Sequence, residues 1–407
     1  MKSTNFKNLI VVAVLMIFCL ALGYGIGAKG FEVNYVKGGN VTISRVTPEP
    51  NVDFSLFWKV WDDINSTYYD KSKIIPSQMV YGAIQGMVNS LGDPYTMFLP
   101  PSENQVTNQD LQGNFSGVGI ELGYKGQNLA VEAPLPGSPA EKAGVKPGDL
   151  IVGIKDAAKN VNITNTQNIT LGQAVEDIRG NTGTKVTLTL VRDGTSQPIT
   201  VDIIRENINV PSVTLEYVGD NKDIAHISIL KFGADTYTEW QKEVADIQTH
   251  QNIKGVILDL RNNPGGYLQD AVDIAGEFLP EGSTVVIQQD GNGNKEPLLT
   301  NREGAFVNTK TVVLINGGSA SASEILSGAL RDDRKIQLVG EKSFGKGTVQ
   351  EPLDLDGGAG IHITVAKWLT PNGTWVHGVG LTPDVKVTQS ATSTSDDQLN
   401  AAVKLFQ

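Results

Sequence analysis

The region between residues 207 and 390 alternates short apolar runs with helix-like patterns, and this alternation restricts the fold more than any other feature. The apolar runs cover residues 225–229, 255–260, 311–315 and 336–339, and a helical pattern covers residues 237–248. Strands that are apolar along their whole length are typical of parallel sheets buried on both faces. Because helices separate these strands, we expect an α/β core whose sheet has helices on both faces.

Length and charge exclude several classes of protein. The chain has 407 residues, enough for two or three domains, and its 33 Lys and Arg against 44 Asp and Glu give a formal net charge of −11. Nucleic-acid binding depends on clustered basic residues, so this charge argues against a nucleic-acid partner. The single cysteine, Cys19, lies in the N-terminal apolar run, and the sequence has no HExxH motif. We expect no metal site and no cofactor.

The stretch from Asn316 to Gln350 contains the residues best suited to a catalytic role. Small residues at 317–323 include three serines and lead into a helical pattern. Backbone N–H groups at the start of a helix are unpaired and carry partial positive charge, so a serine there has stabilisation available for a developing oxyanion. A helix cap made of small residues would look the same. The serine run alone therefore leaves a nucleophile and a plain cap both open.

A serine nucleophile needs a base, and the chain offers histidine or lysine. It has four histidines and no Gly-x-Ser-x-Gly elbow, whereas Lys346 stands between Gly345 and Gly347. Lysine acts as a base only when neutral, which requires its pKa to fall from about 10.4 toward about 7 to 8 through burial. We expect Phe344 and the flanking glycines to provide the apolar surroundings.

The segment from Gly340 to Lys346 also resembles a phosphate-binding loop. That motif needs Ser or Thr directly after the lysine and a helix beyond it. Gly347 occupies the position after the lysine, and the following residues indicate a strand. Nucleotide binding is therefore the less favoured interpretation.

The serine run and residues 340–350, together with motifs at 91–96, 258–266 and 377–384, resemble the carboxyl-terminal processing peptidases, also called tail-specific proteases. The resemblance covers nearly all of residues 52–388. Members of this family are serine endopeptidases with a Ser-Lys catalytic pair. The resemblance implies that Ser321 is the nucleophile, that Lys346 is the base and that Gln350 orients the lysine.

The Gly-rich loop after residue 260 is the expected second half of the oxyanion hole. A turn without chemistry would have a similar sequence, since glycine also serves ordinary turns. The family resemblance implies that one glycine of this loop donates an N–H to the oxyanion, and that the N–H of Ala322 is the other donor. The choice between Gly265 and Gly266 stays open.

Residues 113–206 read as short strands with one helix at 171–178, and residues 186–190 alternate as half-buried strands do. The segment resembles a PDZ domain, a small β-barrel-like module that adds an extended peptide as a strand. The resemblance implies that Arg179 couples peptide occupancy to the active site, whereas we expect Ile178 to belong to the core. The expected peptide-binding residues are Gly117, Val118, Gly119, Ile120, Leu171 and Val175.

The N-terminal residues 1–30 read as a targeting segment. Lys2 and Lys7 precede an uncharged apolar run over residues 9–28, long enough at about 1.5 Å per residue to span the roughly 30 Å bilayer core. We expect a signal anchor that holds the protein on the outer side of the cell membrane, or a signal peptide whose cleavage after Ala28 would release it.

The sequence thus predicts an α/β (α+β) multi-domain chain. Its parts are a signal segment at 1–30, a linker at 31–51, an N-terminal helical region at 52–112, an inserted PDZ domain at 113–206, an α/β sandwich protease core at 207–390 and a tail at 391–407. The resemblance implies homodimerisation through the helical region. The expected function is extracytoplasmic endoproteolysis of protein substrates held by their free C-termini. Two alternatives are a non-catalytic PDZ scaffold and an esterase or peptidase with a histidine base.

Overall fold

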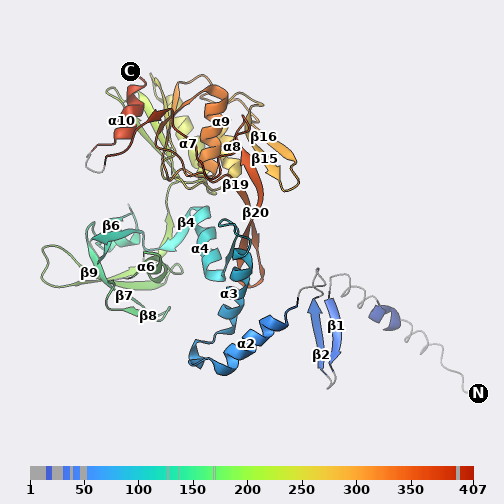
Figure 1. Ribbon diagram of the computed structural model, residues 1–407. Helices are drawn as coiled ribbons and strands as arrows, with labels where there is room; N and C mark the ends of the chain where they lie inside the picture. The colour runs from blue at the N-terminus through green and yellow to red at the C-terminus, as the bar shows by residue number, and fades with distance from the viewer. Residues whose placement is uncertain are drawn as a thin grey trace, which may run out of the picture. The chain divides into compact units, whose positions relative to one another are not determined.

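The computed structural model describes residues 15–20, 31–36, 40–45 and 53–407, except 126, 127, 136, 168, 170 and 391–394 (Figure 1). The chain divides into two compact units, Met1–Val80 and Tyr81–Gln407. Of the predicted signal segment, only residues 15–20 are described, and they are helical. No helix among the described residues is long and apolar enough to cross a bilayer.

The first unit contains a β-hairpin and a helix. Strands β1 (Phe31–Val36) and β2 (Asn40–Arg45) pair antiparallel within the stretch that the sequence predicts to be a linker. Helix α2 (Ser55–Thr67) follows, then a short 3-10 turn (Lys71–Lys73) and the start of α3 (Pro76–Asn89). Helix α2 lies where the sequence predicts a helical region, from residue 52 on, but it buries none of its residues. Its exposed large side chains include Leu56, Trp58 and Val60.

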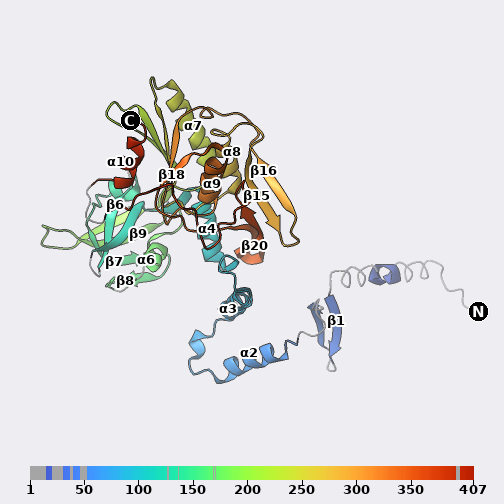
Figure 2. The same ribbon diagram turned by 45° about the horizontal axis from the view of Figure 1, so that its top comes forward.

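The PDZ-like part of the second unit is a strand-built module. Its main sheet has the order β10-β9-β7-β6-β5, with β8 paired to β7. These strands are β5 (Ile120–Lys125), β6 (Asn128–Pro134), β7 (Leu150–Asp156), β8 (Val161–Ile163), β9 (Lys185–Val191) and β10 (Ile199–Ile204). Figure 2 shows β7, β8 and β9 beside α6 (Leu171–Ile178), and α5 (Pro139–Lys142) follows β6. The predicted alternation is confirmed in β9, where Val186, Leu188 and Leu190 are buried.

The protease-like core is built on a six-stranded sheet of order β12-β13-β14-β17-β18-β21, in which only the edge strand β12 is antiparallel to its neighbour. The strands are β12 (Val213–Val218), β13 (Ile224–Ile229), β14 (Gly255–Asp259), β17 (Thr311–Ile315), β18 (Gln337–Gly340) and β21 (Val385–Lys386). Because successive side chains point to opposite faces of a sheet, the central strands β13, β14 and β17, which are buried along almost their whole length, pack on both faces.

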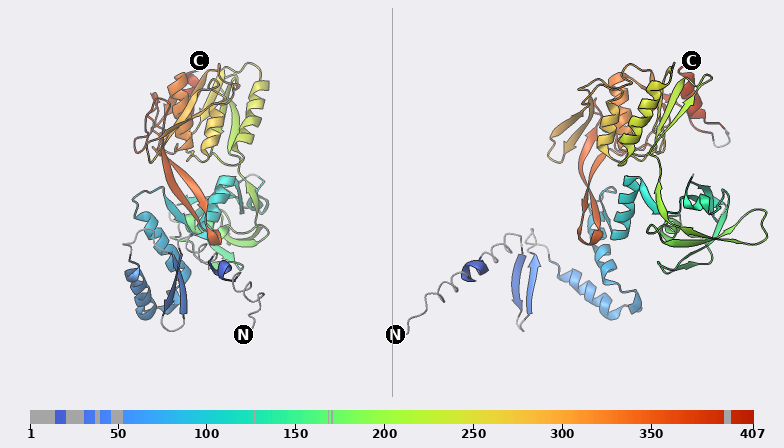
Figure 3. Two further views of the ribbon diagram at one scale, coloured as in Figure 1. Left: turned by 90° about the vertical axis from the view of Figure 1, so that its right-hand side faces the viewer. Right: turned by 180° about the vertical axis from the view of Figure 1, so that it is seen from behind.

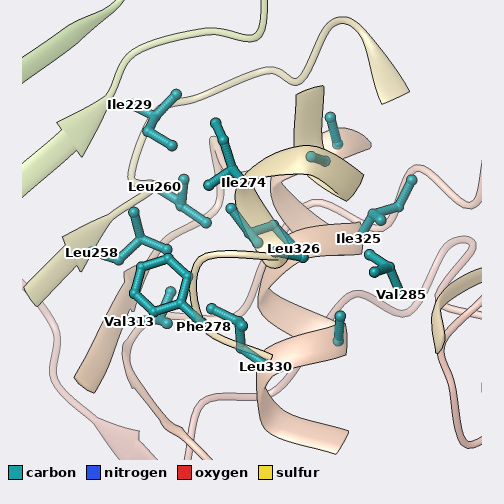
Figure 4. Close-up of a cluster of buried hydrophobic side chains, with 14 of the residues drawn as sticks. Ile229, Leu258, Leu260, Ile274, Phe278, Val285, Val313, Ile325, Leu326 and Leu330 are labelled. Atoms are coloured by element: carbon teal, nitrogen blue, oxygen red, sulfur yellow. The ribbon is translucent and has the colours of Figure 1, made fainter. Parts of the chain in front are cut away.

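Helices cover both faces, as the sequence predicts. On one face, Leu258 and Val313 pack with Phe278 and with Leu326 and Leu330 of α9 (Ala322–Arg334) (Figure 4). Helices α7 (Thr236–Thr249) and α8 (Leu268–Ala275) belong to the same layer. On the other face, the alternate strand residues Ile257, Val312 and Leu314 pack against α10 (Asp397–Lys404).

A second, antiparallel sheet brings distant segments together. Its order is β16-β15-β20-β19, with β3 paired to β20. The strands are β3 (Met97–Leu99), β15 (Thr284–Asp290), β16 (Lys295–Leu299), β19 (Thr348–Asp354) and β20 (Gly360–Leu369). Figure 3 shows β19 and β20 as a long hairpin that extends from the core. Helix α4 (Pro101–Gln112) docks on this hairpin, since the buried Asn104 donates to Asp354 Oδ1 (3.2 Å) and to the Gly358 carbonyl (3.2 Å). Strands β4 (Asn114–Gly117) and β11 (Glu206–Asn209) pair where the chain enters and leaves the PDZ-like module.

Candidate active site

A cavity of about 450 Å³ collects the residues that the sequence singles out for catalysis. Ser321, Lys346 and Gln350 all line it, together with Gly265 and Gly266. These side chains come from the start of α9, from the segment before β19, from β19 itself and from the loop after β14. The apolar part of the wall includes Leu111, Phe232, Ile325 and Trp368.

Ser321 occupies a strained turn directly before α9. Its backbone angles are φ 53° and ψ −115°, a region that residues with a side chain rarely adopt. The turn is held from both sides: the Ala320 N–H donates to the Asn263 carbonyl (3.0 Å), and the Ser321 carbonyl accepts from the Ile325 N–H (2.9 Å). A strained turn between a strand and a helix is the arrangement that exposes a nucleophilic hydroxyl in other hydrolases.

Two backbone N–H groups beside Ser321 have no hydrogen-bond partner among the described residues. One belongs to Ala322, the first residue of α9, and the other to Gly266. The N–H of Gly265, in contrast, donates to Asn263 Oδ1 (2.9 Å). Both glycines are required sterically, since an added Cβ would lie 2.7 Å from the Ser321 Cβ at Gly265 and 1.8 Å from the Phe232 carbonyl oxygen at Gly266. Because the Gly265 N–H already donates to Asn263, only the Gly266 N–H of these two glycines is free to donate to an oxyanion.

Lys346 lies half-buried in the cavity wall, and burial lowers its pKa while the nearby Asp93 carboxylate opposes the change. Its carbonyl accepts from Trp368 Nε1 (2.9 Å), and its Nζ lies 5.1 Å from the centroid of the Tyr95 ring. The expectation that Phe344 shields the amine is wrong, because Phe344 is 56% exposed. The apolar surroundings come from distant segments instead.

Gln350 and Lys346 line the same cavity without a hydrogen bond between them among the described residues. Gln350 Nε2 donates to Thr348 Oγ1 (2.8 Å) and to Thr364 Oγ1 (3.2 Å). With its amide nitrogen so engaged, Gln350 has its carboxamide oxygen left to accept from a lysine. Lys346 Nζ likewise makes no hydrogen bond to Ser321 among the described residues.

Glu324 is a residue of this site that the sequence reasoning missed. Its side chain is fully buried, and one carboxylate oxygen accepts from Ser321 N–H (3.0 Å) and Lys346 N–H (2.8 Å). The other oxygen accepts from Ser343 Oγ (2.5 Å) and Gly345 N–H (2.7 Å). A single carboxylate thus joins the backbones of the two predicted catalytic residues. The Ser-x-x-Glu pattern of a capping box was the signal that could have found it.

The geometry disfavours a histidine base. His226 approaches Asp259 Oδ2 (3.0 Å) and Ser228 Oγ (3.4 Å) through the same nitrogen, Nε2, so it cannot relay a proton between them. His362 lines the cavity, where burial and then the charge of Lys346 lower its pKa. No hydrogen bond joins a histidine to Ser321 within the described part of the chain.

The predicted peptide-binding residues of the PDZ-like module are spread over its strands, its core and the start of α6. Val118 is buried, Ile120 opens β5, and Leu171 packs against the module's core. Gly117 pairs with Glu206 across β4 and β11, and Gly119 faces Ser138, whose Cβ lies 2.4 Å from where a Cβ on the glycine would be. Ile178 is a core residue, as expected.

Val175 and Arg179 face helix α4. Val175 lines a second cavity of about 580 Å³ with α4 residues such as Val106. Arg179 forms an ion pair with Asp110 (3.2 Å), and the Asp110 carbonyl accepts from Lys231 Nζ (2.8 Å). Asp110 and Lys231 both line the cavity that contains Ser321. A chain of polar contacts therefore runs from the PDZ-like helix to the wall of the site.

Three ranges of the chain match the profiles of known protein families. The profile of Peptidase family S41 matches residues 223–387, the PDZ domain profile matches residues 105–191, and the profile of the activating protease CtpB N-terminal domain matches residues 37–101. The carboxy-terminal processing protease CtpA of Bacillus subtilis is 37% identical over 372 residues, which cover 91% of this chain and 77% of the relative. A probable CtpA-like serine protease of Staphylococcus epidermidis is 38% identical over 347 residues, 84% of this chain and 67% of the relative.

Solved structures agree with these matches. The photosystem II D1 C-terminal processing protease aligns with a TM-score of 0.51 at 29% identity, over 86% of this chain and 96% of that one. A putative S41 protease from Bacteroides fragilis aligns with a TM-score of 0.56 at 19% identity, over 85% and 93% of the two chains, and shows a shared fold.

Proposed function

Because this chain belongs to the carboxy-terminal processing proteases of peptidase family S41, we propose that it cleaves peptide bonds with Ser321 as nucleophile and Lys346 as general base. The observation that carries the proposal is their meeting in one cavity, with the lysine half-buried and the serine on a strained turn. Burial favours the neutral amine, which is the form that can accept a proton.

The catalytic steps follow from the atoms in the cavity. Neutral Lys346 takes the hydroxyl proton as Ser321 Oγ attacks the scissile carbonyl, and it then returns the proton to the leaving amine. The free N–H groups of Gly266 and Ala322 hold the oxyanion of the tetrahedral intermediate, since donors fixed in advance stabilise that charge without reorganising. The carboxamide oxygen of Gln350 accepts from Lys346 and keeps the amine pointed at the serine. Water then hydrolyses the acyl-enzyme by the same route.

The PDZ domain accounts for the choice of substrate. A PDZ groove binds an extended C-terminal tail by strand addition, so the substrates are proteins with free, accessible C-termini. The contacts from Arg179 through Asp110 to the cavity wall support the role of Arg179 in coupling tail binding to catalysis. A scaffold that only captures C-termini is disfavoured, because it would have no use for a serine, a buried lysine and two free N–H groups in one cavity.

Two features of the N-terminal residues 1–80 support a dimer at the outer side of a membrane. Helix α2 exposes Leu56, Val60 and Ile64, which recur every four residues on one face, and an apolar helix surface of this kind is typical of an interface. We assign it to contact with a second copy of the chain, as the family resemblance implies. The charge pattern of residues 1–28 supports anchoring with the catalytic part outside the cytoplasm.

The test is cleavage of an unfolded protein such as casein by single variants of the full chain. Ser321→Ala and Lys346→Ala should each abolish cleavage and leave binding of a C-terminal peptide unchanged. The matched control is Lys342→Ala, an exposed lysine on the same segment, which should cleave at the wild-type rate. Near-full activity of Lys346→Ala would contradict the lysine base and make His362, in the same cavity, the base to examine.

A further inference from the structure

The amine of Lys346 is in contact with an aromatic ring that the catalytic scheme does not use. Lys346 Nζ lies 5.1 Å from the centroid of Tyr95, within the range of a cation–π interaction. Among the described residues, Nζ makes no hydrogen bond and no ion pair. The ring is therefore the amine's nearest specific partner in this conformation.

Tyr95 is held firmly in place. Asp93 Oδ1 accepts from the Tyr95 N–H (3.0 Å), and Asp93 Oδ2 accepts from Thr96 Oγ1 (2.7 Å). Thr96 Oγ1 in turn accepts from the N–H of Thr364 on β20 (3.0 Å). The next residues form β3, which pairs with the same strand. The ring is thus fixed to the hairpin that also contains Gln350.

The Tyr95 ring has a second aromatic neighbour. His377 meets Tyr95 edge-on at 5.9 Å and stacks on Trp375 at 5.0 Å. Trp375 Nε1 donates to the carbonyl of Gly347, the residue after the catalytic lysine (2.8 Å). Tyr95 therefore contacts both the lysine amine and a ring stack that is itself tied to the lysine segment.

Several charged groups surround the amine. The Asp93 carboxylate and the negative face of the Tyr95 ring favour the ammonium form, whereas burial and a protonated His362 favour the neutral form. Glu324 is engaged with the backbone N–H of Lys346 and three other donors. Asp110 and Lys231 line the same cavity and carry opposite charges. Of the groups that favour the cation, the ring is the one in direct contact with it.

We propose that Tyr95 is a positioning residue that holds the ammonium form of Lys346 against its ring, in an arrangement without a hydrogen bond to Ser321, and so sets the pH above which the protease is active. The proposal rests on the role of Lys346 as the base. As the pH rises, the amine gives its proton to water, loses the attraction to the ring and becomes free to accept from Ser321. Tyr95 thereby disfavours catalysis at low pH.

The experiment measures kcat/KM against pH for the full chain with an uncharged peptide substrate. Removal of the ring in Tyr95→Leu should shift the rising limb of the profile to lower pH by about one unit, because cation–π attraction to a desolvated ammonium is of that size. Tyr95→Phe keeps the ring face and should retain the wild-type limb. Superimposable limbs for all three proteins would overturn the proposal, and so would equal shifts in both variants.

A second series keeps the shape of the ring, in case Tyr95→Leu does not fold. Phenylalanine rings with one, two and three fluorines at position 95 have progressively weaker negative faces, so the rising limb should move down stepwise with each fluorine. A limb that ignores fluorination would refute the role of the ring. Lys346→Ala, measured in parallel, separates the two claims: if it is inactive while the series shows no shift, only the role of Tyr95 fails.

Discussion

Replacement of Glu324 by glutamine should disable the site while leaving the fold largely intact. The two oxygens of this buried carboxylate accept four hydrogen bonds, two each. Glutamine keeps one carbonyl oxygen and places an NH2 group where the other oxygen was. One pair of donors then faces a donor instead of an acceptor.

The loss in free energy of unfolding depends on which pair of donors loses its acceptor. If the NH2 group faces Ser343 and Gly345, the Ser343 hydroxyl can turn and accept from it, but the hydroxyl proton and the Gly345 N–H then lose their acceptor. In the opposite orientation the N–H groups of Ser321 and Lys346 lose their acceptor and both face the NH2 group as donors. Two buried donors without a partner cost about 2–6 kcal/mol, against a total stability of about 5–15 kcal/mol for a typical domain. Because only the first orientation gives the NH2 group an acceptor, we expect that orientation and a protein that still folds.

The rate should fall by more than the loss of folded protein explains, because Gly345 directly precedes Lys346, the proposed base. A misplacement of about 1 Å can reduce the rate about a hundredfold, so kcat of Glu324→Gln should drop by that order, measured per folded molecule after urea unfolding has given the folded fraction. The control is Glu277→Gln, a carboxylate that is also buried and accepts from Arg302 and the Ala305 N–H away from the cavity. It should lose stability and keep its kcat. Wild-type kcat in Glu324→Gln, or the same loss in both variants, would refute this reasoning.

Three further predictions concern the surroundings of the site. Gly265→Ala should abolish casein cleavage, since its Cβ would lie 2.7 Å from the Ser321 Cβ at a φ of +100°; a fully active variant would contradict the close approach. Burial raises the pKa of Asp270 to about 6, and its Oδ2 is buried without a partner among the described residues, so Asp270→Asn should raise the melting temperature at pH 7.5 and leave it unchanged at pH 4. The wild type loses stability as the pH rises from about 4 through 6, because in that range the Asp270 carboxyl ionises more readily in the unfolded chain than in the folded one. An equal rise in melting temperature at both pH values would show that ionisation of Asp270 is not the cause. Arg261→Leu should lower the free energy of unfolding in urea by about 3–5 kcal/mol, because it leaves the buried Asp259 carboxylate without its 2.6 Å partner; a loss below 1 kcal/mol would show that the pair is dispensable.

The sequence predicts the core sheet well because its strands are buried on both faces. Residues such as Leu258 and Ile257 pack in opposite layers, so the whole strand must be apolar, and that pattern is legible without coordinates. The motif residues Ser321, Lys346 and Gln350 also share one cavity. Their catalytic roles are proposals that rest on the family resemblance and on this geometry.

What the sequence could not predict depends on contacts between distant segments. Phe344 stands two residues before Lys346, yet its side chain is exposed. The neighbours of the lysine come from distant segments instead: Tyr95, in the turn before β3, lies against the amine, and Trp368 of β20 donates to the carbonyl. Local sequence does not say which side chain of an irregular segment points inward.

The hairpin within residues 31–45 was missed although a signal existed. Two glycines at 38 and 39 stand between two runs rich in strand-forming residues, which is a common hairpin pattern. The two prolines farther on, Pro48 and Pro50, suggested a linker for the whole stretch.

The most direct test of the account is the rate of peptide-bond cleavage by Lys346→Met, a variant that keeps an unbranched apolar side chain and has no amine. Single-turnover measurement with a PDZ-binding peptide should show acylation of Ser321 slowed by about 100-fold to 10,000-fold, the usual contribution of a general base, with peptide affinity unchanged. Acylation at the wild-type rate without the amine would contradict the central claim.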